Sequence, residues 1–61
     1  MSFIELLRRA KTLLHEERRL SLRALQRELD LDDDDLEELA SELVDAQRVA
    51  SREANVLVWL G

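Results

Sequence analysis

The chain has 61 residues, of which 46% are hydrophobic, no cysteine, and a formal net charge of −5 at pH 7. So short a chain forms one domain at most, and its apolar residues must be buried together, which leaves few to line a ligand cavity. The lack of cysteine excludes disulfides, thiolate chemistry and sulfur-ligated zinc, and it favours an intracellular protein. We therefore expect a cytoplasmic protein that carries no cofactor.

The N-terminal stretch predicts neither a signal peptide nor a membrane span. Its apolar run is interrupted by charged residues from Glu5 onward, and the longest unbroken apolar run of the chain, "VLVWL", has only five residues. The charges themselves are unevenly distributed. Residues 1–29 carry seven basic and four acidic side chains (+3), residues 30–47 carry nine acidic ones (−9), and residues 48–61 carry two basic and one acidic (+1).

Two amphipathic helices are predicted in the first half of the chain. Helical spacing of apolar residues from Phe3 to Leu14, with Ser2 as N-cap, predicts a first helix over about 3–17. Ser21 can cap a second helix over about 21–29, in which Leu22, Leu25 and Leu29 share one face. Between the two helices, "RRLS" could add a small strand.

A third helix is predicted over about 33–47. Asp32 is the expected N-cap, and Leu31 can reach Leu36 as a hydrophobic staple. Aspartates in the first turn also stabilise the helix dipole, so much of "DDDD" needs no functional explanation. The buried stripe leaves an outward acidic face, which we take as the first candidate interaction surface: Asp33, Asp34, Glu37, Glu38, Glu42 and Asp45.

After Gln47 the pattern changes to short β-prone runs, which predict a hairpin over about 48–60. Asn55 is the residue expected to adopt a left-handed conformation in its turn, and Trp59 is expected on the outer face or at the edge of the core. Three helices followed by a hairpin predict a small α+β fold, a single winged helix-turn-helix-like domain over residues 1–61. The competing fold is a three-helix bundle with a frayed tail.

Enzymatic chemistry is not expected. A calcium-binding loop beginning at Asp30 would need glycine where Asp35 stands and glutamate where Ser41 stands, so the signature fails. His15 is the only histidine and has no second imidazole or thiolate with which to bind a metal. The chain has no glycine-rich phosphate loop and no activated nucleophile, so we expect no catalysis and no small-molecule substrate.

A winged-helix fold raises the alternative of a DNA-binding transcriptional regulator, but the third helix is the wrong one for it. Direct readout needs Arg, Lys, Asn or Gln on that helix, and phosphates would repel its acidic face. We expect no nucleic-acid or membrane partner but a protein partner or self-association, with the acidic face meeting a basic one. The basic candidates lie in the first two helices and between them: Arg8, Lys11, Arg19, Arg23 and Arg27.

The pattern "LSLRALQRELDLDDDDLEELASELVDAQRVA" followed by "NVLVWLG" resembles the N-terminal segment of bacterial adenylate/guanylate cyclase-like proteins. In that family a small helical segment ending in a Val-Leu-Val-Trp strand precedes a class III cyclase domain and an ATPase with helical repeats. The resemblance covers almost the whole chain. Nothing in the sequence matches the cyclase's metal-binding aspartates or its nucleotide site. The resemblance therefore implies a non-catalytic N-terminal accessory module of a larger signalling protein.

Overall fold

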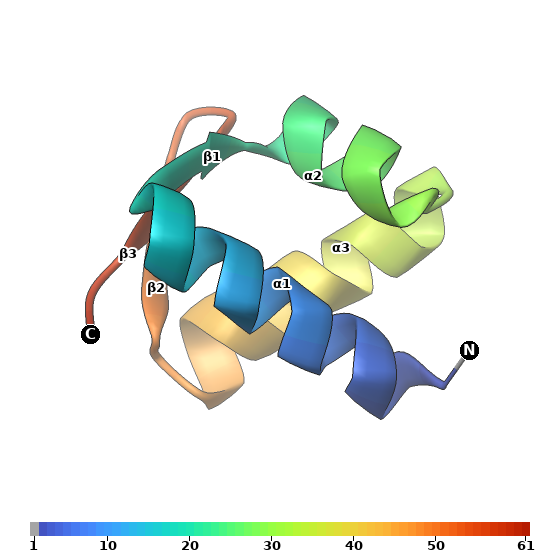
Figure 1. Cartoon of the computed structure of the whole chain (residues 1–61), viewed down its shortest axis with the longest axis horizontal. Helices are drawn as coiled ribbons and strands as arrows, with labels where there is room; N and C mark the ends of the chain where they lie inside the picture. Colours follow the sequence, from blue (N-terminus) through green and yellow to red (C-terminus); the bar gives the residue numbers. More distant parts are fainter. Residues whose placement is uncertain (1) are drawn as a thin grey trace.

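Three helices and a three-stranded antiparallel sheet make up the computed structural model, which describes residues 2–61. The elements follow in the order α1 (Phe3–Glu17), β1 (Arg19–Ser21), α2 (Leu22–Leu29), α3 (Asp33–Ser41), a π-helical turn η1 (Glu42–Ala46), β2 (Ala50–Glu53) and β3 (Val56–Trp59). The predicted small α+β, winged-helix-like fold is confirmed, and the bundle with a frayed tail is not formed (Figure 1).

The three helices begin where their capping residues predict. The side chains of Ser2, Ser21 and Asp32 accept hydrogen bonds from backbone N–H groups three residues later, at 3.2, 3.0 and 2.7 Å. Each bond satisfies one of the N–H groups that a helix start leaves without a partner. The two residues of the predicted staple, Leu31 and Leu36, both lie in the core. They hold the short turn between α2 and α3 in place.

The last turn of the third helix differs from the prediction. We predicted a continuous α-helix to residue 47, but the chain widens to a π-helix over Glu42–Ala46, and the Gln47 N–H donates to the Glu42 carbonyl at 2.8 Å. Arg48 then takes a left-handed conformation with φ 54°, and the Val49 N–H donates to the Leu43 carbonyl at 3.0 Å. This tight exit turns the chain so that Ala50 enters the core at the start of β2.

The sheet has the strand order β1-β3-β2, so the last strand is the central one. Ala50 to Glu53 pair with Trp59 to Val56, which is the predicted hairpin, and Arg19 to Ser21 pair with Val58 to Val56 on the other side. The small strand suggested by "RRLS" is therefore present. The hairpin is the wing of a winged-helix arrangement, and we call it the wing.

The residue in left-handed conformation at the tip of the wing is Ala54, with φ 56°, and not Asn55 as predicted. A positive φ at the first of two central turn residues alone is the pattern of a type II′ hairpin turn. Asn55 has a different role, because its carbonyl accepts the Leu22 N–H at 2.7 Å. This bond ties the tip of the wing to the first residue of α2.

The core lies between the helices and one face of the sheet. Its largest fully buried side chains come from all three helical segments and from β3: Leu14, Leu25, Leu39, Leu43 and Leu57. Trp59 lies on the same face of β3 as Leu57, is partly buried, and closes the edge of the core. The His15 ring meets it edge-on, with ring centroids 5.6 Å apart. Of the two positions that the sequence left open for Trp59, the core edge is the correct one.

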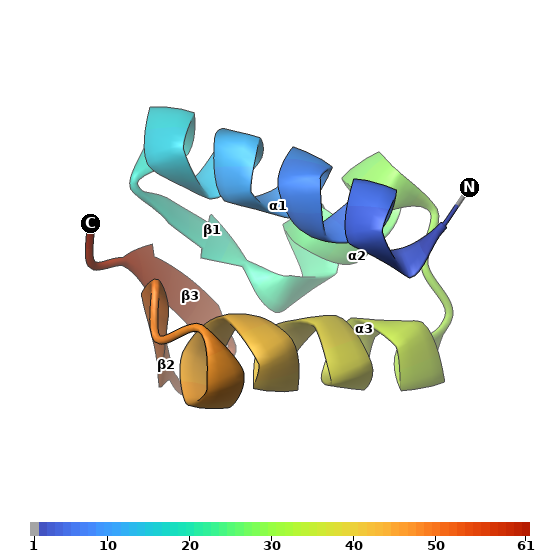
Figure 2. The same ribbon diagram turned by 90° about the horizontal axis from the view of Figure 1, so that it is seen from below.

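Two views define the layers of the molecule. Figure 2 shows α1 and α3 as opposite layers, with α2 behind them and the sheet at one end. The two ends of the described chain lie at opposite ends of the long axis in both views (Figures 1 and 2). Within residues 2–61 the helices are all too short or too polar to cross a membrane.

Candidate protein-interaction surface

The acidic face of the third helix is at the protein surface. Asp33, Asp34, Glu37, Glu38 and Asp45 are exposed, and Glu42 is half-buried. The apolar stripe of the same helix explains this arrangement, since Leu36, Leu39, Ala40 and Leu43 are all buried and rotate the acidic residues outward. The sequence thus predicted correctly which residues of this helix face outward. The structure divides the five exposed residues into two groups with different surroundings.

The first group is an edge that faces α2 and the wing. Asp33 accepts a hydrogen bond from the Gln26 side chain at 2.8 Å. Glu37 forms an ion pair with Arg52 of β2, with 3.3 Å between Nη1 and Oε2. It is the only ion pair among residues 2–61, and both side chains remain solvent-accessible, at 38% for Arg52 and 65% for Glu37. We call Asp33 and Glu37 the paired edge.

The position of Arg52 follows from the register of the sheet. Side chains alternate along a strand, so Arg52 lies on the same face as Ala50, which is buried against the helices. Across the ladder it pairs with Leu57, which is also fully buried. Arg52 therefore stands on the helix side of the sheet, beyond the end of the core. From there its guanidinium reaches α3.

The second group, Asp34, Glu38 and Asp45, is exposed to solvent, with Asp45 at the border of the helix and β2, and we call it the outer acidic line. None of the three pairs with a basic side chain in the described part of the chain, and Asp45 only accepts a 3.4 Å hydrogen bond from Ser41. Asp34 and Glu38 are four residues apart, a spacing at which like charges on a helix repel by a few tenths of a kcal/mol. This repulsion is relieved when a cation approaches from outside.

Two shallow grooves run along the wing side of α3. One has a volume of about 410 Å³ and lies between α2, α3 and the tip of the wing, where Arg23, Gln26, Leu36 and Asn55 contribute to its lining. The other has a volume of about 270 Å³ and lies between the C-terminal half of the helix and β2, over Ala40 and Val44. Glu37 and Arg52 line both grooves. Their ion pair thus stands between the two.

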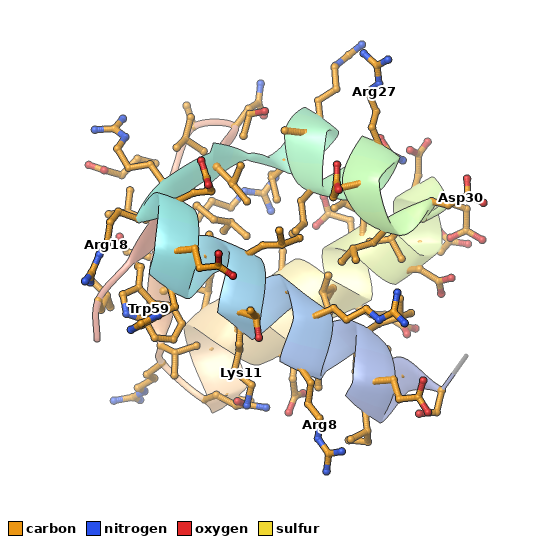
Figure 3. All side chains as sticks on the ribbon, viewed as in Figure 1. Arg8, Lys11, Arg18, Arg27, Asp30 and Trp59 are labelled. Atoms are coloured by element: carbon orange, nitrogen blue, oxygen red, sulfur yellow. The ribbon has the colours of Figure 1, made fainter. Side chains whose placement is uncertain are left out.

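The predicted basic residues do not gather on one face. Lys11 donates to the side chain of Gln47 at 2.9 Å, so it lies beside the end of the third helix. Arg23 lines the α2–α3–wing groove, whereas Arg8 lines a groove between α1 and α2. Arg19 is an exposed residue of β1. Figure 3 shows Arg8, Arg18 and Arg27 pointing in different directions.

Sequence reasoning missed the two side chains that meet the paired edge, Gln26 and Arg52. Arg52 could have been found, because alternation from Ala50 along the predicted strand puts it on the helix side. Gln26 could not, since its contact depends on the angle between α2 and α3. A third omission, Arg9, lines the groove between α1 and α2.

Comparisons with known proteins give no information on the role of this surface. Searches of family models, curated proteins and solved structures found no match to this chain. The resemblance to cyclase-associated segments therefore stays a prediction. Among residues 2–61, no three His, Asp or Glu side chains come together in a way that could hold a metal ion.

Proposed function

We propose that this domain is a non-catalytic protein-interaction module whose outer acidic line docks onto a basic surface, either of a partner protein or of a second copy of the chain. The observation that carries the proposal is the absence of any basic partner for Asp34, Glu38 and Asp45 among residues 2–61. Their neighbours on the paired edge already have partners within the molecule. The charges of the outer line are therefore free to act between molecules.

The energetics require several contacts at once. One exposed ion pair contributes only about 0–1 kcal/mol, so the three carboxylates must act together with surrounding contacts. Such an interface weakens as salt is added, because the Debye length falls from about 10 Å at 0.1 M to about 3 Å at 1 M. If the partner is a second copy, an acidic surface on one molecule meets a different, basic surface on the next. Contacts of that kind need not close into a ring, and open-ended association is expected.

Sedimentation velocity of the wild-type domain at low and at high salt tests self-association directly. Substituting Asp34, Glu38 and Asp45 with serine should reduce association at low salt. Replacing Glu16, Glu17 and Glu53 with serine is the matched control, because it removes the same charge from exposed positions outside α3. A wild type that stays monomeric at millimolar concentration and low salt would refute the second-copy version. Equal effects of the two triple variants would refute the role of the outer line.

DNA binding is the opposed function, and the same charges argue against it. Non-specific affinity for DNA comes from Lys and Arg side chains that neutralise phosphates. The outer acidic line would instead repel the phosphates, and it lies on the helix that would enter the major groove of DNA. The basic side chain nearest to α3 on the wing, Arg52, is held by Glu37. Binding to random duplex DNA near physiological salt should be weaker than the roughly 10⁻⁴–10⁻⁶ M of ordinary non-specific binders. Tighter, salt-sensitive binding in a fluorescence-anisotropy titration would overturn the proposal.

The cellular setting that we propose is an N-terminal accessory domain of a cytoplasmic signalling protein, and its support is the resemblance to cyclase-associated segments alone. In a longer protein that begins with this segment, deleting residues 1–61 should change the assembly state and leave turnover by the cyclase domain unchanged. Light scattering and a cyclase assay would measure the two effects. An unchanged assembly state would contradict this setting.

A further inference from the structure

A groove between α1 and α2 combines unpaired arginines with an apolar floor. Its volume is about 350 Å³, and it is lined by Arg8, Arg9, Thr12, Leu13, Glu28 and Leu29. None of these residues lines either groove along α3. This groove is therefore a surface separate from the one proposed above, and it does not depend on that proposal.

The floor and the rim of the groove have different chemistry. Leu13 and Leu29 pack against the core but remain partly exposed, so each leaves apolar surface open to a ligand. Arg8 and Arg9 are exposed on the α1 rim, and neither forms an ion pair within residues 2–61. Glu28 stands on the opposite rim, on α2. A ligand that fits must be apolar at its centre and negatively charged on the side of α1.

We propose that this groove binds a short acidic amphipathic segment of a partner protein. An apolar side chain of the segment covers Leu13 and Leu29, and its carboxylates pair with Arg8 and Arg9. Arg9 and Leu13 are four residues apart on α1, so their Cα atoms are about 6 Å apart along the helix axis and their side chains share one face. The partner's carboxylate and apolar anchor must have a similar spacing, as they do at positions i and i+3 or i+4 of a helix.

The chain's own third helix fits this groove poorly. Its outer acidic line would supply carboxylates to the two arginines, but the only fully exposed side chain between Glu38 and Asp45 is Ser41, and the partly exposed Val44 lies in the groove beside β2. The apolar floor would then stay uncovered. The groove therefore favours a different protein over a second copy. A module with an acidic surface and an arginine-lined groove can hold two partners at once.

The test is an NMR titration of the ¹⁵N-labelled domain with the helical peptide acetyl-GELLEELLEELLG-amide, in which leucines and glutamates alternate at helical spacing. Amide shifts should be confined to residues 8–13 of α1 and to residues 28–29 of α2. The same peptide with lysine in place of glutamate should bind about tenfold more weakly or not at all. Shifts that are absent, or that lie elsewhere, would overturn the proposal.

Charge variants on the two rims sharpen this test. Arg9→Glu should weaken binding of the acidic peptide about five- to tenfold, because it replaces an attraction with a repulsion. Glu28→Gln should strengthen it, since the opposing carboxylate is removed. Arg27→Glu is the matched control, because Arg27 is exposed on α2 next to Glu28 but does not line the groove.

Two outcomes would contradict the assignment after binding has been observed. Equal weakening by Arg9→Glu and Arg27→Glu would mean that the peptide responds only to net charge. Movement of the same groove amides when the domain alone is concentrated would mean that a second copy occupies the groove. All three substitutions are at exposed helical positions, so circular dichroism should show that each variant is folded.

Discussion

The surface along α3 and the groove between α1 and α2 both bring charged side chains to the edge of an apolar strip, but they differ in whether the fold supplies partners for those side chains. At the paired edge of α3, the wing supplies Arg52 to Glu37 and α2 supplies Gln26 to Asp33. At the groove between α1 and α2, Arg8 and Arg9 have no such counterpart in the described chain. We therefore expect their partners to come from another molecule.

This difference shows that the net charge of an element says little about its role. The third helix is the most acidic part of the chain, yet part of its charge is used to hold the wing in place. The first helix has no net charge, yet it carries Arg8 and Arg9, which form no ion pair within residues 2–61. Charges that remain unpaired after folding identify candidate interaction sites better than the total charge does.

The largest effect should be a loss of stability when the core beneath the α3 surface is truncated. Leu36 is buried and lines the groove between α2, α3 and the wing. Leu36→Ala should lower the free energy of unfolding by about 2–5 kcal/mol, a large part of the total for so small a domain. Thermal denaturation followed by circular dichroism measures the loss.

Ile4→Ala is the control for this prediction, because Ile4 is 55% exposed. It should change stability by about 0.5 kcal/mol or less, as most surface substitutions do. A Leu36→Ala variant as stable as Ile4→Ala would show that this part of α3 does not pack on the core.

A smaller effect should isolate the link between α3 and the wing. A double-mutant cycle of Glu37→Gln and Arg52→Gln should give a coupling of about 0.2–1 kcal/mol, the usual range for an exposed ion pair. Urea denaturation of the four proteins measures it, and added salt should reduce it. The same cycle with Glu38→Gln in place of Glu37→Gln should show no coupling. A coupling in that control equal to the first would mean that the paired edge is not distinct from the outer line.

The smallest effect is the difference in domain stability between two neighbouring substitutions, Glu37→Gln and Glu38→Gln. Glu38→Gln removes like-charge pairs with Asp34 and with Glu42, each worth about 0.2–0.5 kcal/mol, and should stabilise the domain. Glu37→Gln relieves one like-charge pair, with Asp33, but loses the ion pair with Arg52, so it should stabilise the domain less or not at all. A shift of about 0.5 kcal/mol corresponds to about 2–4 °C in melting temperature for a domain of this size, which differential scanning calorimetry resolves. Equal stabilisation by both variants would contradict the division of α3 into two edges.

Most of the fold could be predicted from the sequence because it depends on local signals. The helix starts follow from Ser2, Ser21 and Asp32, whose side chains bond N–H groups three residues away. The change from helical to alternating spacing after Gln47 located the wing, and all the predicted stripe residues of α3 are at least half-buried.

The remaining features depend on contacts between distant segments. The third helix ends in a π-turn because the Val49 N–H reaches Leu43 and Ala50 enters the core, which helical periodicity does not record. Asn55 favours a left-handed conformation in general, but here its carbonyl bonds α2 and Ala54 takes that conformation. The basic residues lie on different sides of the molecule, and predicting this would require the packing angles between the helices. Sequence reasoning therefore identified the charged residues of the site but not their partners.

The place of β3 in the sheet also determines when the domain can fold. β3 is the last of these elements in chain order, yet it lies between β1 and β2, and Arg19 pairs with Val58 near the other end of the sequence. During synthesis, α1, α2 and α3 leave the ribosome before the strand that joins the two edges of the sheet, and Leu57 is still missing from the core. Contacts between residues so far apart in the chain form late in folding. Nascent chains in which Val56–Trp59 is still inside the ribosomal exit tunnel should therefore be cleaved readily by protease, and chains long enough for Trp59 to have left the tunnel should resist it.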